Sequence, residues 1–177
     1  LTLGSLYLEF PEHQNASGFY RDLNLENATT TTRYQVDDVT YTRTTFASFT
    51  DNVIIMHIKA SKANALNFTI AYNFPLVHKV NVQNDKLTVT CQGIEQEGLK
   101  AARRAECHIQ VKTNGTLRPA GNTLQINEGT EATLYISAAT NYVTYQDVSA
   151  NESHRTSEYL KRAMQKPYEK PLKSHIA

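Results

Sequence analysis

Paired carboxyl side chains are the residues of this chain that could do hydrolytic chemistry, because cleavage of a glycoside needs two carboxyl groups that face each other across the bond. Asp37 and Asp38 are adjacent, so on a strand they would point to opposite faces, and their types instead favour a tight turn. Glu95 and Glu97 could share one strand face, but they precede Gly98 in what the pattern predicts to be a long, solvated hairpin loop. We therefore predict no catalytic residue among these acids.

Histidine and cysteine side chains form no recognisable metal site or nucleophile. The six histidines lack the close spacing of a ligand pair, and Cys107-His108 stands alone. His57 alternates with apolar neighbours, which favours a half-buried structural histidine over a ligand. The sequence has no G-x-S-x-G motif and no glycine-rich phosphate loop. We expect no metal ion and no cofactor.

Cys91 and Cys107 are too few for a disulfide scaffold. If they lie in partner strands of one hairpin, its centre is near Leu99, and the two side chains could be cross-strand neighbours that bridge in an oxidising compartment. Two free thiols in the core are the alternative, since cysteine is commonly buried without bonding. The sequence leaves both possibilities open.

The balance of charge excludes two classes of partner. The 177 residues include 18 basic and 17 acidic side chains, a formal charge of +1, which gives no strong field for nucleic acid or for an anionic membrane. Lys100, Arg103 and Arg104 flank one loop without interleaved aromatic residues, so we interpret them as a solvated rim and not as a nucleic-acid site. No run approaches the roughly 18 apolar residues of a membrane-spanning helix. We expect neither nucleic acid nor a membrane span.

The elements that position these side chains are mostly strands. Residues 66–74 have apolar side chains at every even position and mostly polar ones between them, the period-2 pattern of a half-buried strand, and we expect Phe68, Ile70 and Tyr72 in the core. Residues 53–58 are apolar on both faces, which is typical of a central strand. Turn residues at 37–38, 51–52 and 84–85 separate further runs. About ten such strands predict a mainly β fold, an antiparallel sandwich.

The pattern changes after about residue 150. Apolar side chains at positions 159, 160, 163 and 164 form one helical stripe, with Ser153 or Thr156 as the expected N-cap. Lys166-Pro167 is expected to end this helix. Residues 168–176 suggest a second short helix with Pro171 in its first turn. We divide the chain into a β-sandwich domain, residues 1–150, and the start of a helical linker, residues 151–177.

Three segments of the sandwich are LGSLYLEF at residues 3–10, YRDLNLENA at 20–28 and YQVDDVTYTR at 34–43. They resemble the segments LGDLYLEF, Y-R-x-L-D-L-x-x-A and Y-x-V-D-G-V-x-Y-x-R of glycoside hydrolase family 95, the α-L-fucosidases. Asp38 stands where that family usually has a glycine, and aspartate tolerates such a turn. Further similar segments follow in the family's order at residues 46–49, 51–54, 138–142 and 159–160, and at Tyr168, Leu172 and His175.

This resemblance implies an amino-terminal β-supersandwich of the galactose-mutarotase-like type, followed by one or two linker helices. It implies a parent enzyme that hydrolyses terminal α-linked L-fucose with inversion. The parent's catalytic carboxylates would lie in a following helical α/α-barrel, absent from this chain, and a GNGRLGA-type segment would precede Leu1. No catalytic residue is carried over, and we expect the chain alone to be inactive. The expected partners are that barrel of the same protein and a carbohydrate.

Asn141, Tyr142 and Tyr145 follow the strand pattern of residues 132–139 and lead into the longest irregular stretch before the helices. Loops at the end of a sandwich commonly carry recognition, so we predict that these three residues mark a substrate-side loop. A packed structural corner is the alternative, since tyrosine often anchors such corners.

Our leading hypothesis is the non-catalytic N-terminal portion of a bacterial α-L-fucosidase-like enzyme, secreted to the periplasm or the cell exterior. The alternative is a free-standing carbohydrate-binding or cell-surface interaction module. The absence of Trp counts against that alternative, because such modules usually stack aromatic rings on sugars. A third alternative is an inactive, truncated gene product.

Overall fold

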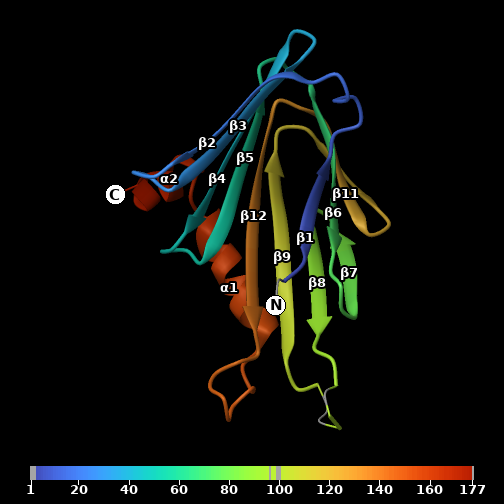
Figure 1. Ribbon diagram of the computed structural model, residues 1–177, viewed down its shortest axis with the longest axis vertical. Coiled ribbons are helices and arrows are strands. Elements are labelled where there is room, and N and C mark those ends of the chain that lie inside the picture. Colours follow the sequence, from blue (N-terminus) through green and yellow to red (C-terminus); the bar gives the residue numbers. More distant parts are fainter. Residues whose placement is uncertain (1–2, 96, 99–100, 177) are drawn as a thin grey trace.

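The computed structural model describes residues 3–95, 97–98 and 101–176. Figure 1 shows two antiparallel β-sheets that face each other, with two helices near the C-terminus. The predicted mainly β sandwich is therefore confirmed, and so is the confinement of helix to the last part of the chain.

Twelve strands are present in the described residues, against the ten or so expected. They are β1 (Ser5–Glu9), β2 (Ser17–Asn24), β3 (Thr29–Val36), β4 (Val39–Ser48), β5 (Val53–Ala60), β6 (Leu66–Asn73), β7 (His78–Gln83), β8 (Lys86–Gln92), β9 (Arg104–Thr113), β10 (Thr116–Ala120), β11 (Thr123–Gly129) and β12 (Glu131–Thr140). One sheet has the order β1-β6-β11-β10 and the other the order β2-β3-β4-β5-β12-β9-β8-β7.

The main core lies between the two sheets. β10 packs near β7, and β11 packs near β8. From β6, Phe68 and Ile70 are buried there as predicted, and Tyr72 is partly buried with its hydroxyl donating to the carbonyl of Leu3. β5 is interior to the eight-stranded sheet, between β4 and β12, which confirms the prediction for residues 53–58.

The turns form where acidic and amide side chains were expected to permit them. Asp37, between β3 and β4, has a φ of 51°, and Asn52 and Asn84 each have a φ of 55°. Asn and Asp adopt this left-handed conformation more readily than most residues. Short polar side chains therefore end these strands and reverse the chain.

Two helices cover the face of the eight-stranded sheet that points away from the four-stranded sheet (Figure 1). They are α1 (Glu152–Met164) and α2 (Glu169–Ile176). Leu160 and Ala163 of α1 are buried against the sheet, which confirms the predicted stripe, and Pro171 lies in the first turn of α2. No helix in the described part of the chain is long and apolar enough to cross a membrane.

The N-cap of α1 differs from the expectation. Asn151, and neither Ser153 nor Thr156, caps the helix by accepting the backbone N–H of His154 at 2.8 Å. Thr156 lies inside the helix, where its hydroxyl donates to the carbonyl of Glu152 at 2.7 Å. Asparagine is as good a cap as serine, so the residue type does not decide which position caps α1. The cap is set by the position at which the chain enters the helix from the preceding loop.

Candidate functional site

Asn141 anchors the loop that follows β12 through side-chain hydrogen bonds. Its fully buried amide donates to the carbonyls of Ala102 and Val148, each at 2.9 Å, and its carbonyl accepts the N–H of Arg104 at 2.9 Å. These bonds join three segments at one end of the sandwich, the lower end in Figure 1. Asn141 is thus packed into a corner of the fold, and the substrate-side role of its loop stays a prediction.

Tyr142 and Tyr145 lie on the same loop and face solvent. The Tyr145 side chain is 84% exposed, and the half-exposed Tyr142 ring lies under the guanidinium of Arg103, 5.4 Å from it. Exposed tyrosine rings can stack on the faces of sugars. The structure therefore separates the three predicted residues into one that positions the loop and two that present rings.

The basic residues near this loop serve mostly as partners of neighbouring side chains. Arg104 Nε donates to a carboxylate oxygen of Glu152 at 2.7 Å, which joins the start of β9 to the start of α1. Burial opposes ionisation of Glu152, but the hydrogen bond and the charge of Arg104, together with a backbone hydrogen bond, outweigh it, so the pKa of Glu152 lies below its ordinary value. Arg103 lies over Tyr142, and Lys100 of the expected rim lies outside the described residues.

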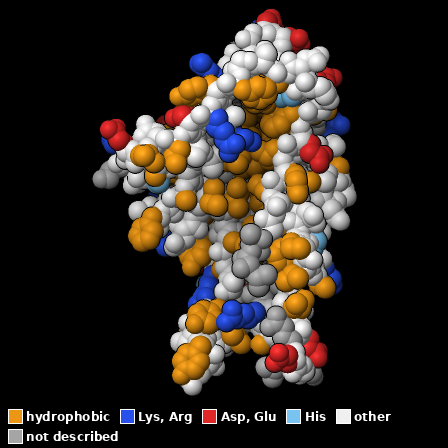
Figure 2. All heavy atoms as spheres, viewed as in Figure 1, with side chains coloured by type: hydrophobic (Ala, Val, Ile, Leu, Met, Phe, Trp, Pro, Cys, Tyr) orange, Lys and Arg blue, Asp and Glu red, His pale blue; other side chains and the backbone are white. Residues whose placement is uncertain are grey.

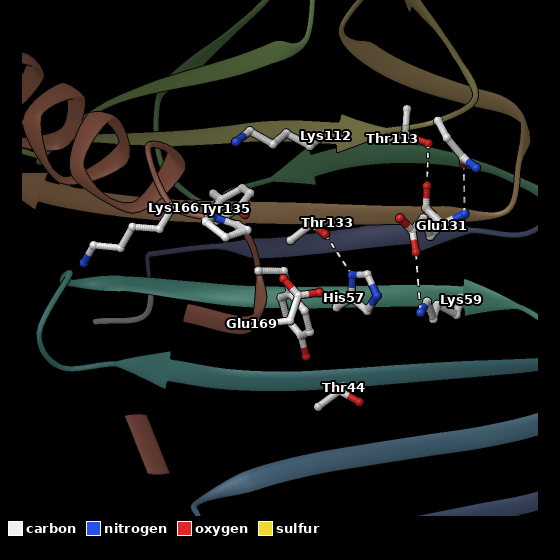
Figure 3. A pocket seen from close by; sticks show the side chains of 13 residues that line it. Thr44, His57, Lys59, Lys112, Thr113, Glu131, Thr133, Tyr135, Lys166 and Glu169 are labelled. Carbon is white, nitrogen blue, oxygen red and sulfur yellow. Dashed lines mark hydrogen bonds and ion pairs between the residues drawn. The ribbon is translucent and has the colours of Figure 1, made fainter. Parts of the chain in front are cut away.

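A polar cavity of about 540 Å³ opens between the sheet and the segment that leads into α2 (Figure 3). His57 of β5 is its central titratable group. Its Nδ1 lies 2.8 Å from the hydroxyl of Thr133, and its ring stacks on that of Tyr168 with centroids 4.2 Å apart. Burial lowers the pKa of His57, with Glu131 opposing the shift. His57 is thus half-buried, as the sequence predicted.

This cavity suits a joint between sheet and linker better than a site for acid–base catalysis. The carboxylate of Glu131 pairs with the ammonium of Lys59 at 3.5 Å, and the ammonium of Lys112 donates to the carbonyl of Met164 at 2.6 Å. One face of the His57 ring stacks on the ring of Tyr168. Since the polar groups are largely occupied with each other, their main effect is to hold the linker against the sheet.

A second ion pair holds Lys166, which lies two residues after the end of α1. Lys166 donates to the buried carboxylate of Asp51 at 2.8 Å. Burial opposes ionisation of Asp51, but the bonds from Lys166 and Ser48, together with the charges of Lys166 and Arg162, outweigh it and lower the pKa of that carboxyl. The turn before β5 is therefore tied to the linker as well.

The acids considered first behave as the sequence predicted. Asp37 and Asp38 form the turn between β3 and β4, where the hydrogen bond from Lys62 lowers the pKa of Asp38. Glu95 and Glu97 are exposed in the connection between β8 and β9. Among the described residues, no group of three His, Cys, Asp or Glu side chains could hold a metal ion.

Cys91 and Cys107 are free, buried thiols on neighbouring strands. Val89 is the register partner of Cys107, and Ala105 is that of Cys91, so the two thiols are offset by two residues. Burial raises the pKa of the Cys107 thiol to about 12. The free-thiol alternative is the one observed; the proposed hairpin centre, Leu99, lies outside the described residues.

A buried polar group on β9 was not predicted. His108 Nε2 lies 2.5 Å from a carboxylate oxygen of Glu106, whereas its Nδ1 and the hydroxyl of its register partner Ser137 have no hydrogen-bond partner among the residues that the structure describes. Burial lowers the pKa of His108 despite the bond to Glu106. Positions 106 and 108 share a strand face, so this pair could be inferred from sequence, but the neighbour Ser137 depends on register. His108, Glu106 and Ser137 lie on the face of the eight-stranded sheet that the helices cover, so we interpret them as structural residues.

Comparison with known proteins gives matches of three kinds: a family, a curated protein and a solved structure. The family described as "Glycosyl hydrolase family 65, N-terminal domain" matches residues 1–145. "Alpha-L-fucosidase 2" of Arabidopsis thaliana is 37% identical over 79 residues, which are 43% of this chain and 9% of that protein. A solved structure named "Putative kojibiose phosphorylase from human microbiome" superposes with a TM-score of 0.55 at 12% identity, over 89% of this chain and 22% of that one.

The structural likeness supports the fold alone, because the identity is low. The matched family is numbered 65, and the matches do not confirm the resemblance to family 95. The chain spans about a tenth of the plant protein and about a fifth of the superposed structure. On the match over residues 1–145, the chain belongs to the glycosyl hydrolase family 65 N-terminal domain family and is an N-terminal β domain of the glycoside hydrolases.

Proposed function

We propose that this chain is the non-catalytic β-sandwich portion of an enzyme that hydrolyses terminal α-linked L-fucose. The observation that carries the proposal is the 37% identity to "Alpha-L-fucosidase 2" over 79 residues. The segments at residues 3–10, 20–28 and 34–43, which resemble those of family 95, support the same substrate. By this proposal the enzyme is bacterial and acts in the periplasm or outside the cell.

The physical task of the domain would be to set the position of a catalytic helical barrel. α1 packs on the sheet, and α2 and the residue before it are held by two stacked ring pairs, His57 on Tyr168 at 4.2 Å and Phe46 on His175 at 4.8 Å. These contacts fix the direction in which α2 leaves the sheet. A barrel joined to α2 would inherit that direction, and the loop with Tyr142 and Tyr145 would wall one side of its substrate cleft.

The test compares the 177-residue chain with the complete protein on p-nitrophenyl α-L-fucoside. We expect nitrophenol release by the complete protein and none above buffer by the chain. A complete protein that instead phosphorolyses kojibiose with inorganic phosphate, and leaves the fucoside intact, would refute the substrate. Activity of the chain alone that disappears in Glu95→Gln or Glu97→Gln would refute the non-catalytic role.

The exposed ring of Tyr145 favours a second candidate, a free-standing carbohydrate-binding or cell-surface module. Titration of L-fucose into the 177-residue chain, followed by NMR, separates the two. Saturable shifts in residues 142–146 that vanish in Tyr145→Ala would support this module. Absence of shifts leaves the barrel-positioning role as the better account.

A further inference from the structure

A groove of about 420 Å³ lies between α1 and the strands β8 and β9. It is on the helix-covered face of the eight-stranded sheet, away from the hollow between the two sheets, where Figure 2 shows hydrophobic side chains and a group of basic ones. Alternation along β9 places His108, Gln110 and Lys112 on the helix-covered face, and Lys86 of β8 is the register partner of Gln110. Sheet and helix therefore supply one wall each.

The wall that α1 supplies is apolar in its middle and polar at its rim. Leu160 is buried, and the partly buried Met164 follows it by one helical turn on the same face of α1. Ser157 and Gln165 also line the groove and are exposed, so their side chains can bond to polar groups of a ligand. This wall suits a small organic molecule better than a bare ion.

Three lysines, Lys86, Lys112 and Lys161, line the same groove. The ammonium of Lys112 donates to the carbonyl of Met164 at 2.6 Å. Lys86 is partly buried, and in the described part of the chain neither Lys86 nor Lys161 forms an ion pair. Two ammonium groups at this groove thus lack a carboxylate partner among the described residues, which favours an anionic ligand.

His108 is the buried polar side chain of the groove. It is 2% exposed, and besides its structural contact with Glu106 through Nε2 it has an Nδ1 without a partner among the described residues. Burial lowers the pKa of His108, and the nearby charge of Lys86 also lowers it, against the effect of Glu106. A neutral ring that donates its Nε2–H to Glu106 has Nδ1 free to accept a hydrogen bond. His108 thus adds an acceptor for a hydroxyl group beside the lysines.

We propose that this groove binds a small organic phosphate, with the phosphate group between Lys86 and Lys161 and the organic part against Leu160 and Met164. A phosphate monoester carries a charge of about −1.5 to −2 at pH 7, which matches the two unpaired ammonium groups. Small-molecule sites typically have volumes of about 300–1,000 Å³, and this groove falls in that range. The apolar wall favours an organic phosphate over inorganic phosphate. The inference is independent of the proposed substrate.

The first test is titration of phenyl phosphate into the ¹⁵N-labelled 177-residue chain, followed by NMR. We expect saturable shifts in the amides of Lys86, Gln110 and residues 157–165. Inorganic phosphate should bind about 10-fold more weakly because it lacks the apolar part, and benzyl alcohol should show no saturation because it lacks the charge. Equal affinity for inorganic and phenyl phosphate would overturn the organic ligand. Shifts without saturation, or outside the groove, would overturn the site.

Variants at the lysines test the assignment of the phosphate group. Lys86→Met and Lys161→Met keep an unbranched apolar stem, and each should weaken phenyl phosphate by about 10-fold, because each removes a charge-assisted hydrogen bond. Lys79→Met is the matched control, since Lys79 is exposed on β7 and outside the groove. Thermal melts check that the variants are folded. Affinity that is unchanged in both groove variants, or lowered equally by Lys79→Met, would refute the proposal.

The second test uses the unmutated chain and so does not depend on the folding of a variant. Its lysines are acetylated with sulfo-N-hydroxysuccinimide acetate, with and without phenyl phosphate, and each site is quantified by mass spectrometry. At a ligand concentration of ten times Kd, acetylation of Lys86 and Lys161 should slow by about 10-fold, because only the free site reacts. Acetylation of Lys79 should keep its rate. Equal rates with and without ligand at Lys86 and Lys161 would contradict the proposal.

Discussion

Truncation of Leu160 to alanine tests whether α1 is part of the folded domain and not an appendage. The Leu160 side chain is 3% exposed and packs in one cluster with Phe46, Ile55 and Tyr135 from three strands of the eight-stranded sheet. The change Leu160→Ala removes its branched end and keeps a good helix former. A loss of stability therefore reports on packing and not on helix propensity.

The expected loss is large because the surroundings cannot close the cavity. Leu→Ala in a core costs about 2–5 kcal/mol, with the higher values where the site collapses least. Here the neighbours on one side are strand residues held by sheet hydrogen bonds on both sides, so we expect about 3 kcal/mol. With a urea m-value of about 2 kcal/mol/M, that loss lowers the unfolding midpoint by roughly 1.5 M.

The assay is urea unfolding of the 177-residue chain, followed by helix circular dichroism and by tyrosine fluorescence. The two signals should change together in the parent chain and in Leu160→Ala, because helix and sheet share one cluster. Glu158→Ala, on the exposed side of α1, is the control and should stay within about 0.5 kcal/mol. A midpoint for Leu160→Ala equal to that of the control, or an earlier separate loss of helix, would refute the reasoning.

Three further outcomes are expected. Phe68→Ala should lower the free energy of unfolding by about 3–5 kcal/mol in the same assay, since the ring is buried between the sheets; an unchanged midpoint would contradict its placement. Tyr145→Ala should leave stability unchanged and raise KM for the fucoside in the complete enzyme; an unaltered KM would remove the residue from the cleft. Stability should fall as pH drops below about 6.5, because burial lowers the pKa of His13, His57 and His108, so the unfolded chain binds protons first. His57→Gln should weaken that dependence, and equal slopes in thermal melts across pH 5–7 would contradict it.

Much of the fold follows from local pattern. Alternation in residues 66–74 predicts which face of β6 is buried, and an apolar run on both faces predicts that β5 is central. The turns at Asp37, Asn52 and Asn84 follow from side chains that tolerate positive φ. These features are predictable because each depends on residues within one strand or turn.

Features that depend on register or on distant segments were missed. β2 has little alternation to reveal it, because nearly all of its residues are exposed. The role of Asn141 requires its bonds to Ala102 and Val148, and the two-residue offset of Cys91 and Cys107 requires the pairing of β8 with β9. The stacking of His57 on Tyr168 requires knowing where α2 lies. In each case the partner is set by the sheet and not by the local sequence.

β5 shows that the two faces of the eight-stranded sheet are covered to different extents. Its side chains alternate, so Val53 and Ile55 face α1 while Ile54 and Ile58 face the other way. The four-stranded sheet buries Ile58 but leaves Ile54 at 44% exposure. A strand that is apolar on both faces is typical of a sheet that has another layer packed on each side. The four-stranded sheet therefore covers only part of the inner face of β5, and Ile54 lies in the part that it leaves exposed.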